Sequence, residues 1–147
     1  MPLSVAILQR LSSSETKVIR NKHEFDSKNS GGVRYAVINL RLVILRNLYG
    51  MDIDRSARIS FGARLDKTNP RGVHIGKESY VASGAIVFAH DFSRSLHADT
   101  RIGERCFIGA NAIIMCGVRI GDEVVVGSGT IVTKDVPSHS IVVGNPG

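Results

Sequence analysis

Residues 102–132 read IGERCFIGANAIIMCGVRIGDEVVVGSGTIV and carry an aliphatic side chain at every sixth position. Neither an α-helix nor a β-hairpin has a period of six. A parallel β-helix built from hexapeptides does, because each short strand ends in a turn and three strands close one triangular coil. The same phase recurs upstream, so that the aliphatic positions are Ile53, Ile59, Leu65, Ile75, Val81, Val87, Ile102, Ile108, Ile114, Ile120, Val126 and Val132.

The remaining positions of the repeat favour the same fold. The residue after the aliphatic is often a glycine, which permits a close backbone approach at a corner. The residue four positions after the aliphatic is small or β-branched, which suits the narrow interior of a triangular prism. These interior residues are Ala57, Ala63, Ser79, Ala85, Cys106, Ala112, Val118, Val124, Thr130 and Val136. A β-sandwich would instead alternate with period two, so the sequence predicts an all-β fold in which residues 51–147 form a hexapeptide-repeat parallel β-helix.

Residues 1–50 are predicted to form an N-terminal extension, helical in part and otherwise irregular. The stretch from Val33 to Tyr49 has the spacing of an amphipathic helix, and Gly50 marks its expected end. We expect this helix to pack over the first coil, because the end of a solenoid needs a cap. Its contact face would comprise Val33, Val37, Leu40, Val43, Ile44 and Leu48, with Arg34, Arg41 and Arg46 lying off that face. A helix that lies on a membrane surface is the alternative.

Composition excludes several classes of protein. The chain has 19 Lys and Arg residues against 13 Asp and Glu, a formal net charge of +6, but it lacks the basic and aromatic platform of a nucleic-acid binder. It has no apolar run long enough to span a membrane and no signal-peptide pattern. Cys106 and Cys116 fall in repeat positions and are predicted to be reduced packing thiols. We therefore expect a cytoplasmic protein whose charge suits anionic small molecules or glycans.

The six-residue phase breaks twice. Four extra residues separate Leu65 from Ile75, and a longer insertion lies between Val87 and Ile102. A β-helix accommodates extra residues only as loops that leave the solenoid at a corner, and loops on a rigid scaffold often carry binding and catalysis. The second insertion is of greater interest because two histidines, His90 and His97, frame it.

The C-terminal half carries three motifs that resemble a known family. They are IGERCFIGANA at 102–112, VGSGTIVTKDVP at 126–137 and GNP at 144–146. They are similar to motifs of the hexapeptide-repeat acetyltransferases, in particular the branch that acetylates sugars and polysaccharides and includes the galactoside, maltose and colanic-acid enzymes. The resemblance covers about residues 53–147 and implies a left-handed β-helix that assembles as a homotrimer with active sites between subunits. It also implies acetyl-CoA as co-substrate and a small-molecule or glycan acceptor, with membrane contact only through a lipid-linked acceptor.

The same resemblance implies roles for individual residues. His90, at the mouth of the second loop, matches the general base, a role that suits an imidazole, and His97 is the fallback. Asp91 would orient that base or shape the loop, and the residues that would orient it or bind the acceptor also include Asp66, Asn69 and Arg71. The implied cofactor-binding residues are Gly109, Ala110, Gly127 and Ser128 at the pantetheine and thioester, and Thr133 and Lys134 near the adenosine and phosphates. The N–H of Ala110 would also stabilise the oxyanion of acetyl transfer.

Two other functions fit a hexapeptide solenoid. A γ-carbonic anhydrase would use three histidine ligands on a metal ion, for which His74, His90 and His97 are the candidates. The TKDVP and GNP motifs favour a CoA-dependent enzyme instead, and no metal ligand is assigned. A non-catalytic scaffold is the third possibility. The loop at 66–71 does not match the galactoside-type pattern, so the acceptor, and the choice between a hydroxyl and an amino group, stay open.

Overall fold

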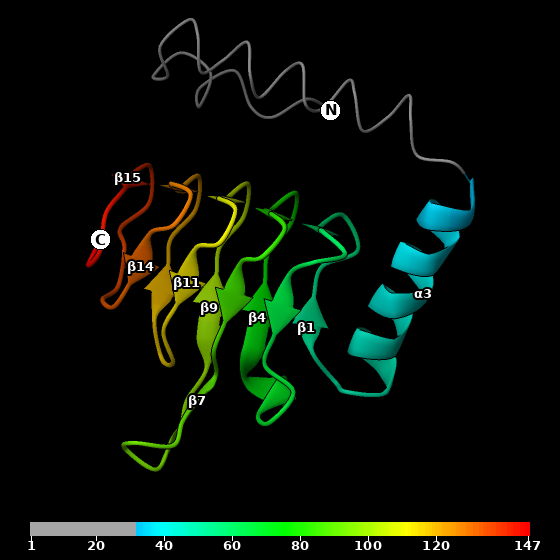
Figure 1. Cartoon of the computed structure of the whole chain (residues 1–147), viewed down its shortest axis with the longest axis horizontal. Helices are drawn as coiled ribbons and strands as arrows, with labels where there is room; N and C mark the ends of the chain where they lie inside the picture. The colour runs from blue at the N-terminus through cyan, green and yellow to red at the C-terminus, as the bar shows by residue number, and fades with distance from the viewer. Residues whose placement is uncertain (1–31) are drawn as a thin grey trace, which may run out of the picture.

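The computed structural model describes residues 32–147 and consists of one helix followed by a triangular solenoid (Figure 1). Helix α3 (Gly32–Asn47) lies against the first coil. Face A contains β1 (Asp52–Ile53), β4 (Val73–Ile75), β9 (Thr100–Ile102) and β12 (Arg119–Ile120). Face B contains β2 (Arg58–Ile59), β5 (Tyr80–Val81), β10 (Phe107–Ile108), β13 (Val125–Val126) and β15 (Ile141–Val142). Face C contains β3 (Arg64–Leu65), β6 (Ile86–Val87), β11 (Ile113–Ile114) and β14 (Ile131–Val132).

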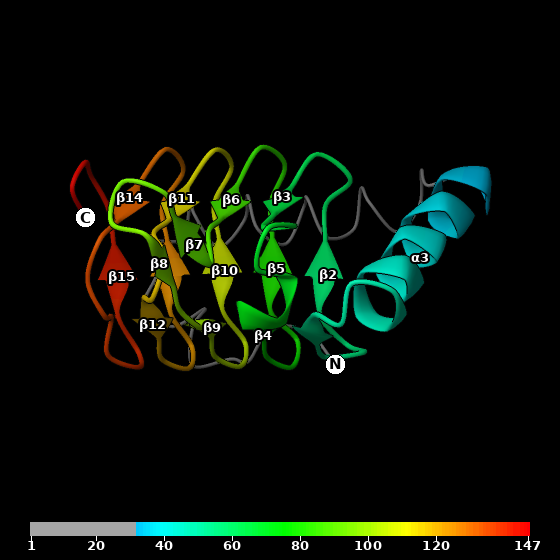
Figure 2. The ribbon, with the colours of Figure 1, turned by 90° about the horizontal axis from the view of Figure 1, so that it is seen from below.

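All pairings within these three sheets are parallel, and each coil visits faces A, B and C in turn (Figure 2). We name the edges of the prism by the faces that they join: the A–B, B–C and C–A corners. The two phase breaks lie at the C–A corner. The first contains the 3-10 turn η1 (Pro70–Gly72), and the second contains an antiparallel ribbon of β7 (His90–Asp91) and β8 (Leu96–His97).

The interior confirms the sequence phase. All twelve aliphatic positions and all ten small or β-branched positions predicted for the interior are buried. Equivalent positions of consecutive coils pair with one another; for example, Ile114 pairs with both Val87 and Val132. The core is therefore a column of stacked side chains, in which one strand residue points inward and its neighbour points outward.

Glycine at the A–B corner follows from the close stacking of coils. A Cβ atom placed on Gly103 would lie 2.6 Å from the carbonyl oxygen of Gly121, and one on Gly76 would lie equally close to that of Gly103. No side chain fits at such distances. The glycines that follow the inward aliphatic residues are thus required by backbone approach, as the sequence predicts.

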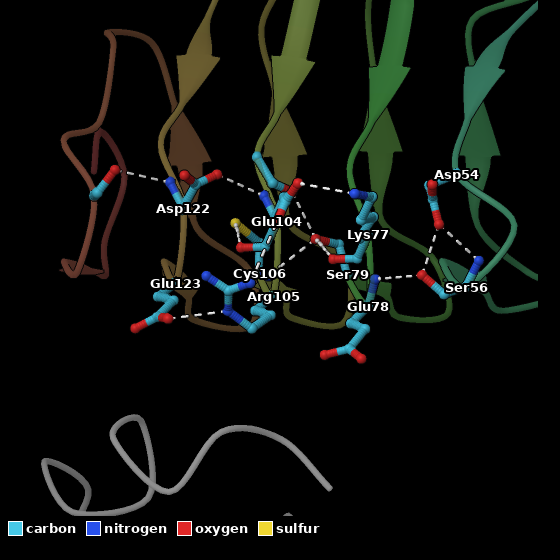
Figure 3. A network of polar contacts seen from close by, with 12 residues as sticks. Asp54, Ser56, Lys77, Glu78, Ser79, Glu104, Arg105, Cys106, Asp122 and Glu123 are labelled. Atoms are coloured by element: carbon cyan, nitrogen blue, oxygen red, sulfur yellow. Dashed lines mark hydrogen bonds and ion pairs between the residues drawn. The ribbon is translucent and has the colours of Figure 1, made fainter. Parts of the chain in front are cut away.

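Side chains at the A–B corner link each coil to the next (Figure 3). The Asp122 carboxylate accepts a hydrogen bond from Glu104 N–H at 2.7 Å. The buried Ser79 hydroxyl donates to Gly103 O at 2.7 Å and accepts from Cys106 N–H at 2.9 Å. These bonds satisfy backbone groups that the short strands leave unpaired, so this corner is structural.

Helix α3 packs through a different face from the one that the sequence predicts. Leu42 and Leu45 are buried, and Ile38 and Tyr49 pack against the core. The predicted contact residues Val37, Leu40, Val43, Ile44 and Leu48 are all at least 40% exposed, and the Val33 side chain is outside the described set. The helix also ends at Asn47, two residues before the predicted end.

The reason for this error lies in the arginines of the helix. The helix covers the end of the solenoid that the first coil forms, where backbone carbonyls lie within reach of its arginines. Arg41 donates to the carbonyls of Ser60, Phe61 and Ala63 at 2.5–2.9 Å. Arg46 donates to those of Ile53 and Asp54 at 2.9 and 2.7 Å. The helix is apolar on nearly every side, so these guanidinium bonds choose which side faces the solenoid.

The outward side chains of the three faces differ in character. Face A carries Asp52, His74, Arg101 and Arg119 in register. Face B carries Arg58, Tyr80, Phe107, Val125 and Ile141, and the rings of Tyr80 and Phe107 stack at 5.6 Å between centroids. Face C carries Arg64, Ile86, Ile113 and Ile131. Two largely apolar faces therefore meet at the B–C corner, opposite a charged face.

The first prediction tests the phase of the interior. Ile108 is fully buried, so Ile108→Asp places a carboxylate without a partner in the core. The cost is several kcal/mol, comparable to the roughly 5–15 kcal/mol that stabilises a typical domain. We expect loss of the cooperative thermal transition in circular dichroism. Ile141→Asp, an outward position that is 54% exposed, should keep that transition; a native-like melt of the Ile108 variant would contradict the assigned phase.

Candidate active site

The two insertions lie beside each other at the C–A corner. Residues 66–72 follow β3 and residues 88–99 follow β6, and these strands are neighbours in face C, with Leu65 paired to Val87. The N–H of Asp66 donates to the carbonyl of Val87 at 3.0 Å. The register of the solenoid therefore decides which residues of the two insertions meet.

The central contact joins Asp66 to His90. The Asp66 carboxylate, whose side chain is 1% exposed, accepts hydrogen bonds from His90 Nδ1 at 2.5 Å and from Ala89 N–H at 2.7 Å. Its other oxygen accepts from the N–H groups of Thr68 at 2.8 Å and Asn69 at 3.4 Å. The His90 side chain is 14% exposed. A fixed carboxylate thus holds the imidazole in one orientation at the edge of the prism.

The protonation of this pair follows from its hydrogen bonds. Burial by itself would raise the pKa of Asp66, but the bonds from Ala89 N–H, from His90 and from the N–H groups of the following turn outweigh burial. The pKa of Asp66 is therefore held below its usual value. An ionised carboxylate only accepts hydrogen bonds, so Nδ1 of His90 carries a proton, and in the neutral imidazole the lone pair then lies on Nε2. This is the arrangement of a carboxylate-oriented general base.

Neighbouring residues fix the backbone beneath the pair. The Asn69 amide donates to the carbonyl of Ala89 at 2.9 Å, and the N–H of Ala98 donates to the same carbonyl at 3.1 Å. Gly72 leaves the space that this packing needs. A Cβ at Gly72 would lie 2.5 Å from the Asn69 amide nitrogen and 3.1 Å from the Cβ of Ala89. Asn69 thus supports His90 from behind.

Asp91 shapes the ribbon and does not contact the His90 imidazole. Its carboxylate accepts from the N–H and hydroxyl of Ser93, at 2.9 and 2.6 Å, and from Arg94 Nε at 2.6 Å. The hydrogen bonds from the Ser93 hydroxyl and then from Arg94 lower the pKa of Asp91 to about 2.

His97 is exposed and pairs through its backbone with His90, and the centroids of their rings are 6.4 Å apart. Arg71 is exposed and lies beside Gly50, near the end of the helix.

The residues assigned to the cofactor divide between two corners. Thr133 and Lys134 follow β14 and lie at the C–A corner, two coils beyond His90. Gly109 and Ala110 follow β10, and Gly127 and Ser128 follow β13, so these four lie at the B–C corner, where Gly129 N–H donates to Ala110 O at 2.8 Å. Face C separates the two corners. Within one chain, the structure therefore brings His90 together with Asp66 and Asn69 but not with Ala110 or Ser128.

His74 lies apart from this site, on face A. Its Nδ1 is 2.9 Å from Asp52 and its Nε2 is 3.3 Å from Asp99, and its side chain is only 18% exposed. His74 is thus a partly buried residue of outward face A, His139 is exposed, and His23 is outside the described residues. The three histidines named for a metal site do not lie together, because His74 is on face A whereas His90 and His97 are on the ribbon. Among residues 32–147, no group of three His, Cys, Asp or Glu side chains is placed to hold a metal ion.

Comparison with known proteins agrees with this architecture. Residues 99–134 match the family described as the hexapeptide repeat of succinyl-transferase. Serine acetyltransferase 2 of Arabidopsis thaliana is 35% identical over 69% of this chain. The solved structure of a maltose O-acetyltransferase from Clostridium difficile 630 superposes with a TM-score of 0.54, at 24% identity, over 81% of this chain and 74% of that structure. The chain belongs to the hexapeptide-repeat acetyltransferase family.

Membership of this family establishes the fold of the chain more firmly than its activity. The fold is the left-handed parallel β-helix of this family. The chain spans 32% of the length of the Arabidopsis relative, and 64% of the YvoF protein of Bacillus subtilis, which is 30% identical over 74% of this chain. No helix in the described part of this acetyltransferase-family chain is long and apolar enough to cross a membrane.

Sequence reasoning missed two features of the site. Asp66 is one of four predicted candidates, and the sequence signal that distinguishes it is its place directly after the inward Leu65, which pairs with Val87, three residues before His90. Phe92 is not among the predicted site residues, although its ring lies 4.7 Å from that of His90 and is 79% exposed. An exposed aromatic inside an insertion was the available signal.

The second prediction concerns the depressed pKa of Asp66. A lowered folded-state pKa contributes stability above the unfolded value, about 3.9, and that contribution is lost as pH falls through the folded pKa. Asp66→Asn should therefore lower the free energy of unfolding by about 1–3 kcal/mol at neutral pH. In urea titrations the difference from wild type should shrink below about pH 4.

Asp135→Asn, which changes an exposed carboxylate on the same corner, is the matched control. Its difference from wild type should be small at neutral pH. A gap between wild type and Asp66→Asn that stays constant from pH 7 to pH 3 would refute the assigned ionisation.

Proposed function

We propose that this protein is a cytoplasmic, acetyl-CoA-dependent acetyltransferase that transfers acetyl directly to a hydroxyl or amino group of a sugar or polysaccharide precursor. The observation that carries the proposal is the Asp66–His90 pair, which joins the two insertions of a hexapeptide solenoid whose relatives are acetyltransferases. Both described cysteines are unpaired and buried, which suits a reducing compartment.

The pair supports a specific mechanism. Nε2 of His90 accepts the proton of the acceptor as its oxygen or nitrogen attacks the acetyl carbonyl of the thioester. Asp66 stabilises the imidazolium that forms. His90 then returns the proton to the departing CoA thiolate as the carbon–sulfur bond breaks, so the base is neutral again at the end of the cycle. The N–H of Ala110 would donate to the carbonyl oxygen while it carries negative charge.

CoA recognition in this proposal uses the remaining motif residues. Lys134 is exposed at the C–A corner and would place its ammonium near a phosphate, with Thr133 beside it. Gly109, Ala110, Gly127 and Ser128 would line the pantetheine and thioester along the B–C corner. The absence of long side chains there is compatible with the close approach of a flexible chain to the backbone.

We further propose a homotrimer in which His90 of one subunit faces the cofactor-lining coils of its neighbour. Two observations support this assembly. His90 and Ala110 occupy different corners of one prism, so a single chain does not offer both to one thioester. Faces B and C expose apolar side chains, among them Ile141 at 54%, and two such faces meeting at an edge suit packing around a threefold axis.

The third prediction tests the base. His90→Ala should lower kcat by about 10²–10⁴-fold, because general base catalysis contributes that factor. Binding of acetyl-CoA should survive. Lys134→Ala should do the opposite, raising the Kd for acetyl-CoA about tenfold through loss of one charge-assisted contact, with little change in kcat. Thiol release with a panel of sugars measures the first effect, and calorimetry measures the second.

His97→Ala is the control for this experiment. His97 lies in the same ribbon as His90 but lacks the contact with Asp66, so its loss should leave most activity. If His97→Ala abolishes turnover while His90→Ala retains it, the base is misassigned. Loss of a bound metal together with activity in both variants would replace the proposal with the carbonic anhydrase alternative, and failure of wild type to bind any CoA would favour a scaffold.

The fourth prediction concerns assembly. Light scattering coupled to gel filtration should give three times the chain mass of 15.9 kDa at micromolar concentration. Ile113→Lys places a charge on outward face C and should shift the mass toward that of a monomer, because it desolvates a charge in the proposed interface. Arg119→Glu changes outward face A and should leave the trimer intact. A monomer mass for wild type would remove the assembly model.

A further inference from the structure

Phe92 lies at the tip of the ribbon that follows β6. Its side chain is 79% exposed, yet its ring centroid lies 4.7 Å from that of His90 with the ring planes at 75°. The two rings therefore meet edge to face, and most of the Phe92 ring remains open. Leaving a large apolar surface in water beside the proposed base is unfavourable, unless a ligand covers it.

The ribbon fixes this ring in place. Asp91 caps the turn through Ser93 and Arg94, on the two sides of its carboxylate. Ser95 N–H donates to the carbonyl of Phe92 at 3.3 Å, and β7 pairs with β8 on both sides of the turn. The ring is therefore positioned before any ligand arrives. A preformed surface of this kind saves the ordering entropy that binding would otherwise require.

The chemistry of the surface selects a class of acceptor. An aromatic face is slightly negative, and it attracts the slightly positive C–H hydrogens on the apolar side of a pyranose ring. His90, whose ring centroid lies 4.7 Å from that of Phe92, would accept a hydroxyl proton at Nε2. A small amino acid acceptor would instead need a cation for its carboxylate, and Arg94, the cation of the ribbon, is already bound to Asp91 at 2.6 Å.

We propose that Phe92 is the acceptor platform of this enzyme: a hexopyranoside lies with its C–H face against the Phe92 ring and donates its reacting hydroxyl to His90 Nε2. This inference rests on the proposed acetyltransferase function and narrows its acceptor to pyranosides. Phe92 is an acceptor-binding and specificity-determining residue in this scheme, whereas His90 performs the proton transfer.

The first experiment measures acceptor binding without turnover. The chain contains no tryptophan, so Phe92→Trp introduces a single tryptophan at the platform, which can be excited selectively over the tyrosines. Titration with methyl hexopyranosides and maltose should change its emission saturably for at least one of them, and L-serine should not. Phe61→Trp is the matched control, because Phe61 is also an exposed ring, on the first coil, covered by Arg41 at 5.7 Å. The control emission should not respond.

The second experiment uses kinetics of the acceptor that responds. Phe92→Ala should raise the KM for that pyranoside about 2- to 10-fold, as expected for one aromatic contact, while the KM for acetyl-CoA stays unchanged. Phe92→Tyr, which keeps the ring face, should restore the wild-type KM. A merely structural role would move both KM values and the melting temperature together.

The outcomes separate this inference from the proposed function. No emission change with any pyranoside, or an equal change in the Phe61→Trp control, overturns the platform. Turnover of L-serine in preference to pyranosides overturns it while leaving an acetyltransferase in place. If Phe92→Ala converts the oligomer to a smaller species, Phe92 is a subunit contact and the platform is overturned. Pyranoside binding to Phe92→Trp without any acetyl transfer by wild type supports the platform and refutes the acetyltransferase.

Discussion

The whole structure depends on the stacking of inward side chains at a fixed spacing of six residues. Each coil repeats the same interior slots, so Val87, Ile114 and Val132 stack directly over one another. A shift of one residue in any coil would turn its aliphatic side chains outward. This constraint fixes the register of the coils. Extra residues are therefore accommodated at the corners, where both insertions leave the solenoid. Fixed register in turn places Asp66 beside Ala89 and His90.

The division between structural and functional corners follows from that rigidity. At the A–B corner, hydroxyl and carboxylate groups bind backbone atoms of adjoining coils (Figure 3). At the C–A corner, the same kind of bond is made by Asp66 and Asn69, but to backbone and imidazole atoms of an insertion. A carboxylate that satisfies backbone N–H groups remains ionised when buried. The groups that secure the insertion therefore also fix which ring nitrogen of His90 donates to Asp66.

The sequence predicts the interior of the solenoid almost completely, because burial in a narrow prism leaves each slot few alternatives. Every interior position from Ile53 to Val136 that the phase selects is buried. Helix α3 shows the limit of this reasoning. With apolar residues on most sides, its contact face is set by long-range bonds from Arg41 to carbonyls about twenty residues away in sequence. The partner of His90 was equally hidden, because Asp66 lies 24 positions away and only coil stacking brings it close.

The bonds from Arg41 and Arg46 also bear on the solubility of the molecule. The outermost coil of a parallel β-helix is an edge: its strands offer a row of hydrogen-bonding groups to which the strands of another molecule could be added. The row includes carbonyl acceptors, among them that of Ile53, and strands of a second solenoid could pair with it. Arg46 donates to the Ile53 carbonyl and Arg41 to corner carbonyls of the same coil, and α3 covers that coil. The helix thus acts as a stop against end-to-end growth into fibres, and it does so with side chains that only donate.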